Sequence, residues 1–158
     1  MRLHKNPPLN IVLYEPQIPP NTGNIARLCA ATKCHLILLG KLGFDLSDKQ
    51  LKRAGLDYWQ WASWEHFPDA EVFFETLVPE NFHFLSVYNE RPYTKIHPNE
   101  GDYLFFGKET SGLPNEWMKR FPEHCFTLPM WEKGVRSLNL GSSVAVVVYD
   151  CLRQLGKF

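Results

Sequence analysis

Residues 9–32 read LNIVLYEPQIPPNTGNIARLCAAT, and the pattern of apolar residues changes half-way along this stretch. The run Leu9–Tyr14 is short, apolar and rich in residues that favour strands, which predicts a buried strand. In the second half, four residues keep the spacing of a helix with one inward face: Ile25, Leu28, Cys29 and Thr32. The stretch therefore predicts a strand followed directly by a helix that Asn21 or Thr22 would cap.

The same alternation continues along the chain. Further strands are expected at 35–39, 82–87, 103–106 and 125–130, with a strand and turn around the tryptophans at 59–64. Helices are expected at 47–55, 70–77, 114–121 and 138–155. The run VAVVVY in the last segment would also fit a strand, but its helical period holds for four turns and Gly156 follows it. Strands that alternate with helices predict an α/β fold with a mainly parallel sheet flanked by helices.

Length and composition indicate one domain. The chain has 158 residues, 44% of them hydrophobic, and no repeat or Gly/Ser linker interrupts it. We interpret residues 9–158 as a single domain and residues 1–8 as an N-terminal arm that need not be ordered. Neither a membrane span nor a secretory signal is expected, so the cytoplasm is the default location.

The net charge and the spacing of the cysteines and histidines argue against binding of nucleic acid by the whole surface and against a metal site. The formal net charge is zero, with 17 basic and 17 acidic residues, so any RNA binding must rest on a local patch. KQLKR (residues 49–53) and MRLHK (residues 1–5) are the candidates, although each would also fit a solvated surface. The four cysteines form no CxxC pair and the six histidines are dispersed. We therefore expect buried, reduced thiols and no metal site.

Loops that follow strands deserve attention because ligands bind at the carboxyl ends of parallel strands. In the first loop and its helix, Gly23 would allow close backbone approach, and Arg27 lies away from the inward helix face. Arg27 is then either a solvent-facing residue of an ordinary capped helix or a group that grips a phosphate or activates a hydroxyl.

Two later loops also follow predicted strands and carry polar residues. LFFGKETSGLP (residues 104–114) carries Glu109 between two glycines, but it lacks the Lys-Ser/Thr pair of a P-loop and also fits a simple strand-to-helix turn. LPMWEKGVRSLNLGSSVAVVVYD (residues 128–150) brings Arg136, Ser137 and Asn139 to a helix N-terminus. That arrangement suits an anion or polar cofactor, and it also suits helix capping by Ser137 or Asn139.

Taken together and in this order, these stretches resemble the motifs of the SPOUT class (TrmH/SpoU superfamily) of RNA ribose 2'-O-methyltransferases. The resemblance is closest to the tRNA (cytidine(34)-2'-O)-methyltransferases of the TrmL type, and it runs from about Leu9 to Gly156. LGFDLSDKQLKRAGLDYW (residues 42–59) and ERPYT (residues 90–94) belong to the resemblance as well.

The resemblance implies a fold, a cofactor and partners. The expected fold is an α/β domain with a C-terminal deep trefoil knot, and the expected assembly is a homodimer. The cofactor would be S-adenosyl-L-methionine, bound by five residues: Leu85, Gly107, Glu109, Leu128 and Ser137. Arg27 and Asn139 would be catalytic, and the substrate would be the wobble nucleotide of tRNA, cytidine or modified uridine at position 34. No metal is implied, because a sulfonium is already a strong methyl donor.

The residue types suit this chemistry. A ribose 2'-hydroxyl is a poor nucleophile at neutral pH, so a group must stabilise the developing oxyanion while the methyl donor is held in line. Arg27 would do so as activator and orienter, since the high pKa of a guanidinium makes it a poor base. Lys49, Lys52 and Arg53 would bind tRNA phosphates. Methylation of another tRNA or rRNA nucleotide, and an RNA-binding dimer without catalysis, remain open as alternatives.

Overall fold

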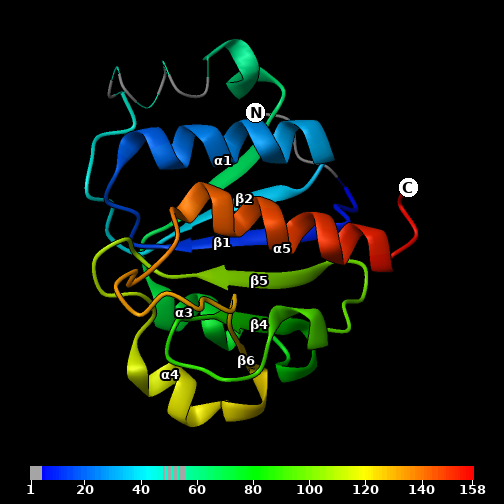
Figure 1. Cartoon of the computed structure of the whole chain (residues 1–158). Coiled ribbons are helices and arrows are strands. Elements are labelled where there is room, and N and C mark those ends of the chain that lie inside the picture. The colour runs from blue at the N-terminus through cyan, green and yellow to red at the C-terminus, as the bar shows by residue number, and fades with distance from the viewer. Residues whose placement is uncertain (1–4, 48, 50, 52, 54–55) are drawn as a thin grey trace.

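The computed structural model describes residues 5–47, 49, 51, 53 and 56–158 (Figure 1). Within these residues one sheet has six strands in the order β3-β2-β1-β5-β4-β6, and each pairing is parallel. The strands are β1 (Leu9–Tyr14), β2 (His35–Leu39), β3 (Ser63–Phe67), β4 (Phe82–Leu85), β5 (Asp102–Phe106) and β6 (Cys125–Phe126). The predicted α/β fold with a parallel sheet is confirmed.

Helices cover both faces of the sheet (Figure 1). On one face α1 (Pro19–Thr32) and α5 (Leu140–Gln154) lie side by side, and on the other lie α3 (Ala70–Glu75) and α4 (Asn115–Arg120). Four short 3-10 helices complete the described elements: η1 (Leu56–Gln60), η2 (Pro79–Asn81), η3 (Tyr93–Lys95) and η4 (Pro122–His124).

Each face of the sheet has its own core. In β1, Ile11 and Leu13 point toward α1 and α5, whereas Val12 points to the cluster that contains residues of α3 and α4. Strands buried on both faces need apolar residues at every position, which explains why β1 reads as an unbroken apolar run. The buried face of α5 consists of Val144, Val147, Val148, Cys151 and Leu152. Burial of each valine or leucine side chain contributes about 1.5–3 kcal/mol.

The structure corrects the predicted start of α1. The helix begins at Pro19, two residues before Asn21, and the residue before it, Ile18, makes no side-chain cap hydrogen bond. Proline fits the first turn because the N–H it lacks would have no helical partner there. The prediction that Asn21 or Thr22 caps the helix is therefore wrong.

Other boundaries shift by a few residues. Pro114 precedes α4 instead of opening it, and the tryptophan segment divides into η1 and β3. The strand expected at 82–87 ends at Leu85, and the one expected at 125–130 keeps only Cys125–Phe126. Much of the helix expected at 47–55 lies outside the described residues, as do residues 1–4 of the expected arm. No described helix is long and apolar enough to cross a membrane.

Candidate active site

Three neighbouring strands end side by side at one edge of the sheet. In register, Leu85 at the end of β4 pairs with Phe106 of β5 and with Phe126 of β6. Neighbouring strands lie about 4.8 Å apart, so the residues that follow these three strand ends are close in space. Gly107 and Leu128, two of the predicted cofactor residues, are among them. The topology thus brings Leu85, Gly107 and Leu128 to one edge.

The loop after β5 folds back tightly on itself. A Cβ atom on Gly107 would lie 2.1 Å from the backbone carbonyl carbon of Gly112, which no side chain allows. Gly112 itself has φ +71°, and Lys108 pairs with it across an isolated antiparallel bridge. Both glycines are therefore required by the shape of the loop.

Two polar contacts clamp this loop onto the segment between β1 and α1. The Lys108 ammonium lies 2.8 Å from the Glu15 carboxylate, and this hydrogen bond lowers the pKa of Glu15 and raises that of Lys108. The side-chain oxygen of Gln17 accepts hydrogen bonds from the backbone N–H and the hydroxyl of Thr110, at 3.2 and 2.7 Å. Glu15 is held with φ +44°, a conformation that non-glycine residues seldom adopt.

Glu109 completes the clamp. Its carboxylate accepts hydrogen bonds from the backbone N–H groups of Gln17 and Ile18, at 2.9 and 3.1 Å. It also accepts one from the Asn21 amide at 3.3 Å. A helix start carries unpaired N–H groups and a partial positive charge, so a carboxylate is well suited to this place. Glu109 therefore satisfies donors at the start of α1 that no local cap reaches.

Asn21 carries the connection on to α5. Its side-chain oxygen accepts a hydrogen bond of 3.0 Å from the Asn139 amide. The Asn139 side-chain oxygen in turn accepts from the backbone N–H of Ser142 and caps α5, so the capping alternative is confirmed for this residue. Glu109, Asn21 and Asn139 form a polar relay that joins the loops after β1 and β5 to the start of α5.

Asn21 is the member of this relay that sequence reasoning missed. It was predicted to cap its own helix, yet it is 7% exposed and bonds to residues 88 and 118 positions away. Its position on the first turn of a helix that follows a strand could have marked Asn21 as a residue of the site. Its partners could not be found from spacing along the chain.

The remaining predicted residues lie outside the relay. Arg27 is exposed on α1, with its guanidinium 4.8 Å from the centre of the Tyr58 ring. Ser137 lies in the stretch 131–139, in which each residue is exposed. Of the predicted RNA-binding residues, Lys49 and Arg53 are exposed and Lys52 lies outside the described residues.

The described residues offer neither a metal-binding group nor a reactive thiol. Among the described residues no group of three His, Cys, Asp or Glu side chains could hold a metal ion. The four cysteines are buried and unpaired. Burial raises the pKa of Cys34 to about 11 and that of Cys151 to about 12, so these thiols stay protonated at neutral pH.

Comparison with known proteins decides the family. The model of the SpoU rRNA methylase family matches residues 8–149, which include the whole sheet and the relay. The chain belongs to this family. The tRNA (cytidine(34)-2'-O)-methyltransferase of Saccharophagus degradans (strain 2-40) is 45% identical over 148 residues, which cover 93% of this chain and 96% of that protein.

Solved structures agree with this SpoU family membership. A structure that addresses the 2-OH methylation of C/U34 on tRNA superimposes with a TM-score of 0.86 at 43% identity, covering 95% of this chain and 97% of that one. The SpoU methyltransferase AviRb from Streptomyces viridochromogenes, solved with S-adenosylmethionine, has a TM-score of 0.84 at 19% identity. It covers 98% of this chain and 63% of its own, and at that identity it supports the fold alone.

The residue types at this edge are compatible with the family's methyl donor. S-adenosylmethionine presents an adenine, a ribose and an amino-acid end, which need backbone hydrogen bonds and apolar contact. At the ends of β4, β5 and β6, Leu85 and Leu128 are apolar and Gly107 has no side chain. The exposed stretch 131–139, which follows Leu128 closely in the chain, adds further backbone groups.

Proposed function

We propose that this chain transfers the methyl group of S-adenosylmethionine to the ribose 2'-hydroxyl of nucleotide 34 of tRNA, a cytidine or a modified uridine. The observation that carries the proposal is the 45% identity to a tRNA (cytidine(34)-2'-O)-methyltransferase over nearly the whole of both chains. That match includes the loops after β1 and β5 and the start of α5. We therefore infer both the substrate and the reaction from it.

The cofactor would be held by Leu85, Gly107, Glu109, Leu128 and Ser137, and it would supply an electrophilic methyl group. Both carboxylate oxygens of Glu109 already accept hydrogen bonds from the start of α1. Its contribution to cofactor binding is therefore to fix the loop that contains Gly107. Asn139 is expected to orient the substrate from the start of α5, where Asn21 restrains its amide.

Arg27 would activate the 2'-hydroxyl. The positive guanidinium would stabilise the oxyanion that forms as the hydroxyl loses its proton. The guanidinium carbon lies over the Tyr58 ring, 4.8 Å from its centre, and this cation–π contact would help to hold the side chain in place. We assign Arg27 the role of activator, with an RNA phosphate as the proton acceptor.

A homodimer is part of the proposal. Arg27 is exposed and outside the relay, and the stretch 131–139 is exposed throughout, with Trp131 91% exposed. A second copy that covers this surface would bring Arg27 of one protomer near the cofactor loops of the other. We also propose the trefoil knot of the SPOUT class for the segment before α5, a single domain over residues 9–158, and a cytoplasmic location.

Binding of tRNA would involve the basic segment at 49–53. Lys49 and Arg53 are exposed, and a dimer would join two such segments into one surface. Reversing both charges, Lys49→Glu with Arg53→Glu, should weaken tRNA binding and its dependence on salt while the affinity for S-adenosylmethionine is unchanged. Unchanged tRNA affinity would contradict this assignment.

The test of the proposed function uses purified protein, labelled S-adenosylmethionine and tRNA that lacks the modification. Arg27→Ala should lower kcat by about 10²–10³, the usual effect of removing a group that stabilises an oxyanion. Arg120→Ala is the matched control, because Arg120 is also exposed and also lies over an aromatic ring, 5.2 Å from the centre of Phe121. Wild-type protein that methylates no RNA would overturn the proposal.

A further inference from the structure

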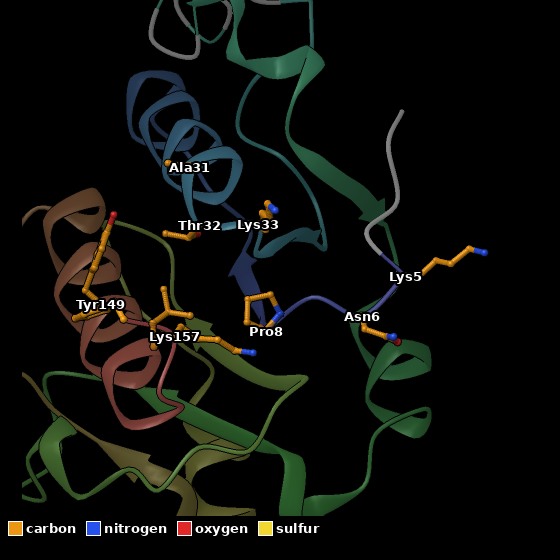
Figure 2. Close-up of a pocket in the computed structure, with 10 residues that line it drawn as sticks. Lys5, Asn6, Pro8, Ala31, Thr32, Lys33, Tyr149 and Lys157 are labelled. Atoms are coloured by element: carbon orange, nitrogen blue, oxygen red, sulfur yellow. The ribbon is translucent and has the colours of Figure 1, made fainter.

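Exposed aromatic side chains lie at both ends of the molecule. Tyr149 and Phe158 line a hollow between α5, the end of α1 and the segment before β1, and their ring centres lie 6.2 Å apart (Figure 2). Tyr88 lies at the opposite end, beyond the carboxyl end of β4, and is 75% exposed. Within the described part of the chain, its ring pairs with no other ring and no cation.

The loop that carries Tyr88 is fixed at both ends to one short segment. The N–H of Ser86 donates to the carbonyl of Phe126 at 2.9 Å, and the N–H of Thr127 donates to the carbonyl of Arg91 at 2.8 Å. Phe126 and Thr127 are neighbours in the chain, so the two ends of the loop lie close together. Residues 87–90 therefore project from the sheet as a short excursion, which we call the 87–90 loop.

Side-chain contacts brace both ends of the 87–90 loop. The hydroxyl of Ser86 accepts a hydrogen bond of 3.3 Å from the N–H of Tyr88. The guanidinium of Arg91 donates to the carbonyl of Glu123 at 2.6 Å. A ligand that contacts the ring then meets a loop that is already ordered, which lowers the entropy cost of binding.

The 87–90 loop also lies between two of the proposed cofactor residues. Leu85 directly precedes Ser86, and Leu128 directly follows Thr127. Tyr88 comes three residues after Leu85, so their Cα atoms are at most about 10 Å apart. The ring is therefore within reach of a nucleotide whose ribose faces the methyl donor.

The chemistry of the 87–90 loop favours a base over a phosphate. Its sequence is VYNE, which contains one acidic residue, Glu90, and no lysine or arginine. Attraction to phosphates needs positive charge, which this loop does not offer. An exposed aromatic face is a surface on which an unpaired base stacks, and RNA-binding proteins commonly recognise single-stranded loops in this way.

We propose that the ring of Tyr88 stacks on the base of nucleotide 34 while the ribose of that nucleotide is methylated. The inference rests on the proposed function, because it takes the same nucleotide as the ligand. Stacking tolerates different bases, since every base has an aromatic face. The contact would thus hold a cytidine and a modified uridine alike.

The first test compares Tyr88→Ala with wild type in tRNA binding and in kinetics. Kd for tRNA should rise about 5- to 150-fold, the range that corresponds to the loss of one stacked base. The ratio kcat/KM for tRNA should fall by a similar factor. The salt slope of binding, the affinity for S-adenosylmethionine and Tm should keep their wild-type values, because the ring is exposed and contacts no phosphate.

Two further substitutions at this position separate stacking from simple apolar contact. Tyr88→Phe keeps the ring and should bind tRNA as the wild type does. Tyr88→Leu keeps an apolar side chain without a ring and should resemble Tyr88→Ala. The matched control is Val72→Ala, because Val72 is 58% exposed on α3, on the other face of the sheet, and its loss should leave Kd unchanged.

A tRNA with an abasic ribose at position 34 gives the sharpest comparison. This tRNA keeps the phosphates and the 2'-hydroxyl but has no base to stack. Wild type and Tyr88→Ala should therefore bind it with the same Kd. An equal loss of affinity for the intact and the abasic tRNA on Tyr88→Ala would overturn the inference.

Other results would overturn it as well and leave the proposed function intact. One is a Tyr88→Ala variant that binds and methylates intact tRNA as the wild type does. Another is wild-type affinity in Tyr88→Leu. A Tyr88→Ala variant that becomes monomeric in sedimentation would show that the ring belongs to a protein interface. Wild-type protein that neither binds nor methylates tRNA would overturn both the inference and the proposed function.

Discussion

Replacement of Glu109 by alanine should destabilise the protein even when no cofactor is present. The carboxylate accepts three hydrogen bonds, from the N–H groups of Gln17 and Ile18 and from the amide of Asn21. Hydrogen bonds to a charged group contribute about 1.5–3 kcal/mol each when buried, and about 1 kcal/mol is appropriate here because the site is half open to water. The expected loss is therefore about 2–3 kcal/mol in the free energy of unfolding.

Thermal unfolding followed by circular dichroism measures this loss. For a chain of this length, 1 kcal/mol corresponds to about 2–4 °C, so Tm should fall by roughly 5–10 °C. Glu109→Gln keeps one acceptor oxygen and should lie between Glu109→Ala and wild type. Glu75→Ala is the control, since Glu75 is exposed near the end of α3 and should leave Tm unchanged.

One result would refute this reasoning. If Glu109→Ala unfolds at the wild-type temperature without cofactor, but loses affinity for S-adenosylmethionine in calorimetry, then the carboxylate contacts the cofactor directly and does not clamp the loops. A fall in Tm together with weaker cofactor binding is the expected result, because the loop that contains Gly107 depends on the clamp.

Three further predictions concern other parts of the fold. Gly107→Ala should prevent the loop after β5 from closing and strongly lower Tm, because its Cβ would lie 2.1 Å from a backbone carbon. The thiols should not react with Ellman's reagent at pH 8 in the native protein, since burial raises the pKa of Cys34 to about 11 and that of Cys151 to about 12. The lowered pKa of Glu15 stabilises the fold above the usual carboxyl pKa, and this contribution should disappear as the pH falls through the lower native value. Tm measured from pH 7 to pH 3 should therefore fall less steeply for Glu15→Gln than for wild type.

Each of these has a control and a contradicting outcome. Gly134→Ala should be tolerated, because the nearest atom to its Cβ would be a flexible glutamate oxygen at 3.3 Å; equal effects at both glycines would contradict the loop geometry. All four thiols should react once the protein is unfolded, and rapid reaction in the native state would contradict their burial. Parallel pH profiles for Glu15→Gln and wild type would show that the pair with Lys108 does not contribute.

The sheet and its two layers of helices could be predicted from the sequence because their signal is local. The central strands β1 and β2 are short, mostly apolar runs, and the spacing from Val144 to Leu152 distinguishes a helix from the strand that VAVVVY would also fit. Helix starts were less predictable. At α1 the polar residues suggested a local cap, whereas the prolines begin the helix two residues earlier.

The relay could be predicted only in part. The resemblance to a family drew attention to Glu109 and Asn139 but not to what they contact. Their link through Asn21 joins positions 88 and 118 residues apart, and only the parallel topology brings such positions together. Arg27 was expected in the same site, and in the single chain it is exposed against Tyr58, because it lies on α1 six residues beyond Asn21.

Position-resolved mapping of ribose methylation tests the central claim most directly. tRNA from cells that lack this protein would be compared with tRNA from the parent strain, and with the same tRNA after incubation with purified protein and S-adenosylmethionine. The account predicts that a 2'-O-methyl group at nucleotide 34 is absent in the deletion strain, returns with the wild-type protein, and does not return with Arg27→Ala. Unchanged methylation at nucleotide 34 in the deletion strain, or restoration of a methyl group at a different nucleotide, would contradict it.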